Sequence, residues 1–203
     1  MDILNKSGAF TGRIVDYNIR EELEHGIYVS KLARATAHDM HLSPAMVYNI
    51  ALAGLLHDIG KLKLEEEMKA ERESGFLVTE EIKYVRSHAR HSFKILEERG
   101  YPLEILEIVR YHHENYDGTG YPSHLRGEEI PLGARVVRVC DVFAALTTDR
   151  PYRQRFTVED AMQMMIDECM HYDMQVFLHF QRLIHRVGSS YQYHLSEGDL
   201  TWL

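Results

Sequence analysis

The sequence contains few of the residues that stabilise small secreted domains or cross membranes. Its two cysteines, Cys140 and Cys169, have no CxxC spacing, which excludes a disulfide framework and a cysteine-bound zinc finger. No run approaches the roughly 18 apolar residues of a membrane-spanning helix, and the N-terminal residues lack the apolar region of a secretory signal. We therefore expect a cytoplasmic protein with no membrane span, and both thiols in its core.

The chain also lacks an excess of positive charge. Its net charge of -8 at pH 7 argues against general binding to DNA, RNA or an anionic membrane, although a local basic pocket could still bind a small anion. A length of 203 residues suits one domain with short arms. The compositional feature that stands out is histidine, with 13 residues.

Helical periodicity dominates the local signals, and no convincing strand alternation is present. Ser43 and Pro44 suit the N-cap and first turn of an apolar helix that ends near His57 and Asp58. We expect that helix to be buried. The complete set of predicted helices is 15–39, 44–56, 79–98, 103–112, 131–146, one that begins near 157, and 173–187. The sequence therefore predicts an all-α fold, with an arm over 1–15, a domain over 16–187 and a tail over 188–203.

Paired residues of metal-ligand type occur at the ends of these helices. His57 and Asp58 follow an apolar segment, where a charged carboxylate is costly unless it is paired or bound to metal. His112 and His113 end another helix, and Asp141 interrupts the apolar run VVRVCDVFAAL. Asp141 could instead be a core carboxylate with satisfied hydrogen bonds. Taken together, these pairs favour a metal site for hydrolysis over a structural site.

Three further residues join this set with weaker signals. Glu21 and His25 are four residues apart on one helical face, as are many ordinary surface pairs. His88 lies within a predicted helix and by itself is no evidence for a metal site.

Five methionines on the late helices are interpreted as core filling, namely Met162, Met164, Met165, Met170 and Met174.

The donors are all nitrogen and oxygen, which suits iron, manganese or zinc. Two ions about 3.5–4 Å apart can share a hydroxide and clamp a phosphoryl group, so the expected reaction is phosphoester hydrolysis. Lys61 follows the His57–Asp58 pair and could meet a phosphate. Arginines crowd one later stretch and either bind phosphate or form a solvated basic face; they are Arg126, Arg135, Arg138, Arg150, Arg153 and Arg155.

These motifs occur in the order found in one known family. HDIGK at 57–61, HHENYDGTGYP at 112–122 and GEEIPLGARVVRVCDVFAALTTDRPYR at 127–153 closely resemble the HD-GYP family of cyclic dinucleotide phosphodiesterases. The resemblance covers roughly residues 16–187. One departure is Ala144, which stands where the family usually has a second aspartate.

The resemblance implies an HD-domain helical bundle with a GYP loop. It also implies hydrolysis of cyclic di-GMP to pGpG and GMP through a metal-bridging hydroxide, with two or three divalent ions, iron or manganese before zinc. Its metal ligands fall on Glu21, His25, His57, Asp58, His88, His112, His113 and Asp141. Its substrate-binding positions fall on Lys61, Tyr121, Arg150 and Arg153, and Asp58 and Lys61 are the expected catalytic residues.

Two other functions stay open at this point. The chain could hydrolyse another cyclic dinucleotide, such as cyclic GMP-AMP, or another phosphoester. It could also be a non-catalytic signalling module that binds the dinucleotide, or a diguanylate cyclase (GGDEF) domain through the GYP loop. Oligomeric state is left open by the sequence.

Overall fold

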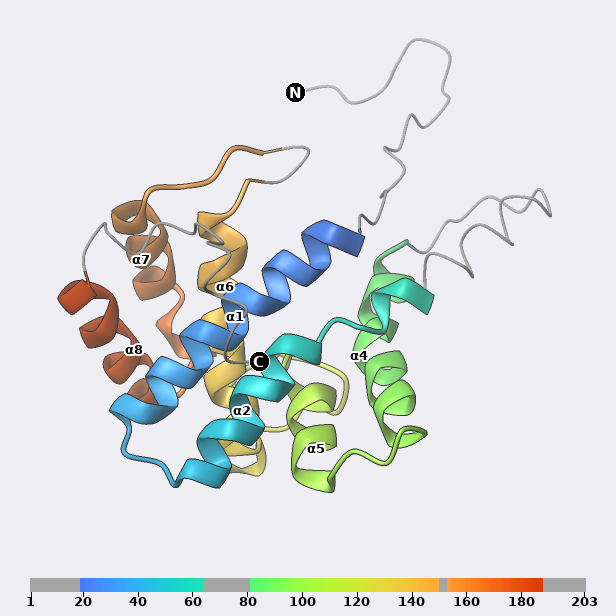
Figure 1. The fold of residues 1–203 in the computed structure, drawn as a ribbon. Helices are drawn as coiled ribbons and strands as arrows, with labels where there is room; N and C mark the ends of the chain where they lie inside the picture. Colours follow the sequence, from blue (N-terminus) through green and yellow to red (C-terminus); the bar gives the residue numbers. More distant parts are fainter. Residues whose placement is uncertain (1–18, 64–80, 150–152, 188–203) are drawn as a thin grey trace, which may run out of the picture.

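Helices form the secondary structure elements of the computed structural model, which describes residues 19–63, 81–149 and 153–187 (Figure 1). The α-helices are α1 (Ile19–Asp39), α2 (Pro44–Leu56), α4 (Glu81–Glu97), α5 (Leu103–Tyr111), α6 (Leu132–Thr147), α7 (Val158–Asp167) and α8 (Met174–Val187). Two short 3-10 helices cover Gly127–Glu129 and Cys169–His171. The predicted all-α fold is confirmed.

Capping residues explain where two helices begin. The hydroxyl of Ser43 accepts a hydrogen bond from the Met46 amide at 3.3 Å, and Pro44 occupies the first turn of α2. The Thr157 hydroxyl accepts from the Asp160 amide at 3.0 Å at the start of α7. The predicted start of α4 at Thr79, the arm 1–15 and the tail 188–203 lie outside the described residues, so the division into arm, domain and tail stays a prediction.

The core forms where α1 and α6 cross. Leu32 of α1 and Phe143 of α6 are almost completely buried, and the Phe143 and Phe180 rings pack edge to face with centroids 5.1 Å apart. Helices α7 and α8 flank this pair on one side, and α4 and α5 lie on the other (Figure 1). The helices that carry the expected ligands therefore converge on a packed centre.

Glycine allows α1 and α2 to approach closely. A β-carbon at Gly26 would lie 2.5 Å from the Leu55 carbonyl oxygen, and the Ser30 hydroxyl donates a hydrogen bond to the Ala51 carbonyl at 2.7 Å. This contact brings the α1 residue next to Gly26, His25, beside the end of α2.

Helix α2 is less buried than predicted. Ile50, Ala53 and Gly54 are buried, whereas Met46 is 42% and Tyr48 is 65% exposed. The helix packs on α1, α5 and α6, and these neighbours cover one of its sides. An apolar composition thus overstated its burial, because it does not say how many neighbours the fold supplies.

The late helices correct two more predictions. Cys140 is buried, but Cys169 is only partly buried at the start of a 3-10 helix. Met162 and Met165 face the core as predicted, whereas Met164, Met170 and Met174 are 41%, 66% and 47% exposed. Met164 and Met174 fall on the exposed faces of α7 and α8, and Met170 lies in the 3-10 helix between them.

An ion-pair cluster joins α8 to the end of α1. Asp39 lies 2.8 Å from the Nδ1 atom of His179 and accepts a hydrogen bond from Arg186 at 2.6 Å.

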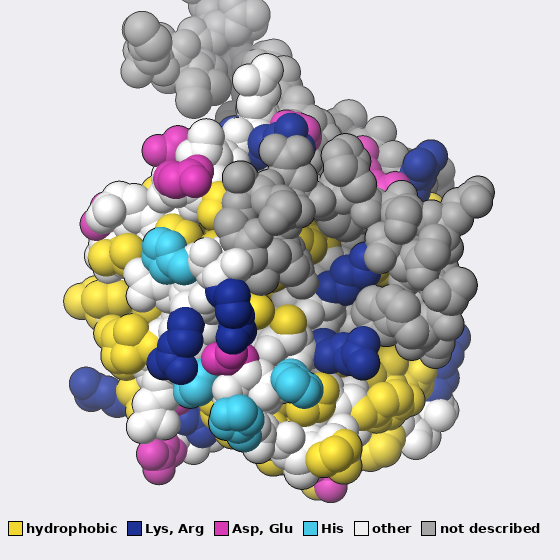
Figure 2. Space-filling view, turned by 60° about the vertical axis from the view of Figure 1, so that its left-hand side comes forward, with side chains coloured by type: hydrophobic (Ala, Val, Ile, Leu, Met, Phe, Trp, Pro, Cys, Tyr) yellow, Lys and Arg dark blue, Asp and Glu magenta, His cyan; other side chains and the backbone are white. Residues whose placement is uncertain are grey.

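When the molecule is turned so that α7 and α8 face the viewer, hydrophobic, basic and histidine side chains share the visible face (Figure 2). Within the described residues, every helix is too short or too polar to cross a lipid bilayer.

Candidate metal centre

The turn after α2 fixes the positions of His57 and Asp58. His57 is the C-cap of α2, and both side chains are buried. Two residues later, the Gly60 amide donates a hydrogen bond to the Ser92 hydroxyl of α4 at 2.8 Å. A β-carbon at Gly60 would collide with the backbone of His88 and Ser92, so only glycine allows this approach. The turn therefore places Asp58 next to His88.

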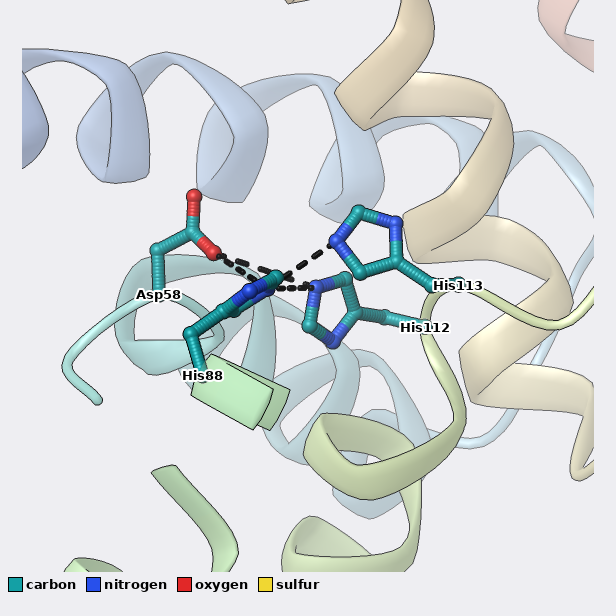
Figure 3. A group of neighbouring side chains, drawn as sticks. All are labelled: Asp58, His88, His112 and His113. Carbon is teal, nitrogen blue, oxygen red and sulfur yellow. Dashed lines mark hydrogen bonds and ion pairs between the residues drawn. The ribbon is translucent and has the colours of Figure 1, made fainter. Parts of the chain in front are cut away.

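Asp58, His88, His112 and His113 form a first group, the Asp58 group, whose potential ligand atoms all lie within 4.8 Å of one another. They come from the α2 turn, α4 and the end of α5, and they point toward one centre (Figure 3). The Oδ1 atom of Asp58 lies 3.1 Å from the His88 Nε2 atom. That nitrogen is 3.0 Å from Nε2 of His113 and 3.4 Å from Nε2 of His112.

His25, His57 and Asp141 form a second group, the Asp141 group, by the same distance criterion. The Asp141 Oδ1 atom lies 3.0 Å from Nε2 of His25 and 3.6 Å from Nε2 of His57. The Oδ2 atom of Asp58 lies 3.2 Å from that same His57 nitrogen. Asp58 therefore has one carboxylate oxygen toward each group, as a carboxylate that bridges two ions requires.

The ring orientations suit metal binding. The Nδ1 atoms of His57 and His112 lie 2.8 Å and 2.7 Å from the carbonyl oxygens of Gly54 and Val109. If each Nδ1 donates a proton there, Nε2 presents its lone pair to the group, which is the usual arrangement of a histidine ligand. The Nε2 atom of His57 and the Oδ1 atom of Asp58 are buried and make no hydrogen bond within the described part of the chain. These nitrogen and oxygen donors fit divalent cations.

The electrostatics keep the carboxylates ionised. Burial by itself would raise the pKa of Asp58, but the charges of His57 and Lys61 hold that pKa well below its usual value. Burial likewise opposes ionisation of Asp141, but its hydrogen bond with His25 and the charge of His57, whose Nε2 atom is 3.6 Å away, hold its pKa well below the usual value. Both residues can therefore offer anionic oxygens to a cation.

Burial affects the histidines differently. It lowers the pKa of His113 to about 3 and the pKa of His112 well below its ordinary value, so both rings are neutral near pH 7. Burial also disfavours charge on His57, but Asp58 and Asp141 raise its pKa to about 10. Metal binding at His57 would release that proton.

Lys61 lies between two carboxylates at the centre, those of Asp58 and Glu22. Its Nζ atom is 2.5 Å from Oδ2 of Asp58 and 3.0 Å from Oε2 of Glu22. Burial disfavours its charge, but these two carboxylates raise the pKa of Lys61 above its usual value, so it stays cationic. The structure thus places Lys61 in an ion pair with Asp58 and Glu22.

The two acids at the start of α1 are placed differently from the expectation. Glu21 is exposed and belongs to neither group, whereas its neighbour Glu22 reaches Lys61. Glu22 was not among the residues expected at the site. Its spacing of three residues from His25 also puts it on the same helical face, which is the signal that could have found it.

The loop after His113 closes over one side of the Asp58 group. The Tyr121 ring stacks on His113 with centroids 4.7 Å apart, and its amide donates to the His113 carbonyl at 3.1 Å. Glu114, which was not among the expected site residues, is buried and accepts hydrogen bonds from the Ser123 and Leu125 amides at 2.6 Å and 3.1 Å. Its carboxylate shapes the GYP loop.

The structure describes one of the two arginines expected to bind substrate. Arg150 lies outside the described residues. Arg153 donates hydrogen bonds to the carbonyls of Ala145 and Leu146 at 2.7 Å and 3.2 Å, and its guanidinium lies 4.5 Å from the centre of the Phe156 ring. Arg153 thus caps the C-terminal end of α6.

Comparison with known proteins agrees with this arrangement. The family model for the HD domain matches residues 3–176. A cyclic di-GMP phosphodiesterase of Pseudomonas aeruginosa is 36% identical over 79% of this chain and 38% of its own length. A 3'3'-cGAMP-specific phosphodiesterase of Vibrio cholerae is 32% identical over 93% of this chain and 43% of its own length. This chain thus spans about two fifths of these relatives.

Solved structures share the fold. An HDG"Y"P protein from Bdellovibrio bacteriovorus superposes with a TM-score of 0.63 at 21% identity, over 80% of this chain and 52% of the other. The HD domain of the L. monocytogenes phosphodiesterase PgpH, in complex with cyclic-di-AMP, gives a TM-score of 0.54 at 16% identity, over 87% of this chain and 94% of the other. At these identities the likeness concerns the fold.

Proposed function

This chain belongs to the HD-domain family, and from that membership we propose that it is a metal-dependent phosphodiesterase of the HD-GYP type that hydrolyses cyclic di-GMP to pGpG and GMP. The observation that carries the proposal is the position of Asp58, whose two carboxylate oxygens face two separate histidine groups. Such a pair of adjoining groups suits two divalent cations that share one carboxylate.

The proposed ligands are the members of the two groups, namely Asp58, His88, His112, His113, His25, His57 and Asp141. We propose iron or manganese, with zinc as a further candidate, because nitrogen and oxygen donors accept all three. When bound, such ions polarise a phosphoryl oxygen and lower the pKa of water. Glu21, the eighth expected ligand, stays a prediction for a third ion.

The protein groups around the ions have separate roles in this proposal. Lys61 is cationic and balances the negative charge of Asp58 and of a phosphate that approaches it. The Tyr121 ring, held against His113, offers an aromatic surface to a base. The Glu114 carboxylate keeps the loop that carries Tyr121 in place.

A second substrate is supported by specific relatives. Three relatives from Vibrio cholerae, at 30% to 32% identity, are named 3'3'-cGAMP-specific phosphodiesterases. The groups that hold phosphate and ions do not distinguish guanine from adenine, so cyclic GMP-AMP is the alternative substrate.

Contact with a diguanylate cyclase domain through the GYP loop stays a prediction. We also propose a cytoplasmic location, in keeping with the free thiols of Cys140 and Cys169.

The test is hydrolysis of cyclic di-GMP and of cyclic GMP-AMP by protein loaded anaerobically with Fe(II) or Mn(II), with products resolved by chromatography. We expect pGpG or GMP from the wild type, and loss of both turnover and bound metal in Asp58→Ala. Asp167→Ala removes an exposed carboxylate on α7 and is the matched control. An Asp58→Ala protein that keeps full activity and metal content would refute the assignment.

A further inference from the structure

One arginine of α6 lies on the same face as a proposed metal ligand. Arg138 precedes Asp141 by three residues, so their side chains are neighbours along the helix. Arg138 is partly buried, and its Nε atom donates a hydrogen bond to Oδ1 of Asn115 at 3.1 Å. Asn115 lies two residues after His113, at the base of the GYP loop. Arg138 therefore connects the helix of Asp141 to the loop of Tyr121.

Other arginines of this stretch are engaged elsewhere. Arg135 forms an ion pair with Asp173 at 2.6 Å, and Arg153 caps the end of α6. Arg138 differs, because within the described residues its hydrogen bond runs through Nε and leaves the two terminal nitrogens for a ligand. A guanidinium oriented through Nε can still offer both terminal nitrogens to phosphate oxygens.

A second guanidinium approaches the same loop from α4. The Arg86 guanidinium lies 5.3 Å from the centre of the Tyr121 ring, and that ring stacks on His113. The charges of Arg86 and Arg138 both act on Tyr121, and that of Arg138 also acts on His113. Positive charge therefore gathers beside the histidines but outside the two metal-binding groups.

We propose that Arg138, assisted by Arg86, binds the phosphodiester of a cyclic dinucleotide that is not being hydrolysed. This inference rests on the proposed function. A cyclic dinucleotide carries two phosphodiesters on opposite sides of one ring, and only one of them can lie at the Asp58 and Asp141 groups. The other keeps a full negative charge, and Arg138 supplies the nearby donors that would match it.

The proposal separates substrates with two phosphates from those with one. Arg138→Gln should raise the KM for cyclic di-GMP by about 10- to 100-fold, the loss expected for one or two charge-assisted hydrogen bonds. The kcat should change little. Turnover of bis(p-nitrophenyl) phosphate, which has a single phosphodiester, should be unchanged. Arg99→Gln, an exposed site near the far end of α4, removes the same charge and is the matched control.

A purely structural role makes a different prediction. If Arg138 only held Asn115, then Asn115→Ala would reproduce its effect, and both substrates would suffer equally. That result, or an unchanged KM for cyclic di-GMP in Arg138→Gln, would overturn the inference.

Calorimetric binding of cyclic di-GMP to the manganese-loaded full chain separates this inference from the proposed function. If the wild type binds cyclic di-GMP without hydrolysing it, the proposed function fails. A wild type that binds more tightly than Arg138→Gln would still support the role of Arg138. Equal binding, or no binding by either protein, would refute it.

Discussion

Asp173 serves two structural roles that two substitutions can separate. Its Oδ2 atom accepts a hydrogen bond from Arg135 of α6 at 2.6 Å, and its Oδ1 atom accepts from the Gln175 amide at 2.9 Å in the first turn of α8. The side chains of Arg135 and Asp173 are 14% and 9% exposed. Asp173→Asn removes the charge and keeps a capping oxygen, whereas Asp173→Ala removes both.

The expected losses differ in size. Asp173→Asn leaves the Arg135 charge unpaired in a largely buried position, which costs about 3 kcal/mol of unfolding free energy, the lower end for a broken buried pair. Asp173→Ala should cost about 1 kcal/mol more, because it also removes the cap of α8. If Asp173 has both roles, the free energy of unfolding should decrease in the order wild type, Asp173→Asn, Asp173→Ala.

Urea denaturation at pH 7, followed by circular dichroism, measures these differences. Asp160→Asn is a suitable control, because it changes an exposed aspartate in the first turn of α7 that bonds to Thr157 and forms no ion pair within the described residues. It should cost under about 1 kcal/mol. If Asp173→Asn were as stable as the wild type, the ion pair would contribute nothing. If the Asn and Ala variants were equally stable, the capping role would be wrong.

Three other predictions concern the centre, its loop and the cluster at the end of α1. Ser92→Ala should lower the unfolding free energy by about 1–3 kcal/mol, because it leaves the buried Gly60 amide without its acceptor; urea denaturation measures this, and an unchanged midpoint contradicts it. Glu114→Gln should increase the rate of hydrogen exchange about tenfold at the Ser123 and Leu125 amides, which Glu114 accepts hydrogen bonds from. Exchange at the wild-type rate would contradict the role of Glu114 in holding the loop. Hydrogen bonds from His179, and then from Arg186, lower the pKa of Asp39 from 3.8. The ionised Asp39 therefore stabilises the fold fully above about pH 4, and this stabilisation is lost as the pH falls through the lower pKa of the folded state. Asp39→Asn should accordingly lose less unfolding free energy than the wild type between about pH 4 and pH 2. Equal losses, measured by urea denaturation at each pH, would refute this.

Local sequence signals located the helices well, because their causes are local. Ser43 and Thr157 accept hydrogen bonds from amides three residues later, as their positions before helical patterns predicted. Burial was harder to predict. Tyr48 and Met170 are exposed although apolar composition indicated a core, because burial depends on neighbours that are distant in the sequence.

The candidate centre shows the same division. Seven of the eight expected metal ligands come together in two groups, because the family resemblance assigned them by residue type and by their order along the chain. The choice between Glu21 and Glu22 could not be made locally, since both spacings from His25 fit one helical face. The rotation of α1 against the α2 turn decides it, and this rotation directs Glu22 toward Lys61.

The family, the all-α class and the set of nitrogen and oxygen donors could be read from the sequence, because each depends on residue types and short spacings. Which charged groups meet depends on the packing of the helices. It placed Asp58 between two histidine groups and directed Arg153 to the end of α6. It also set Arg138 beside the GYP loop. These contacts join residues far apart in the chain, and their geometry is fixed by how the helices pack.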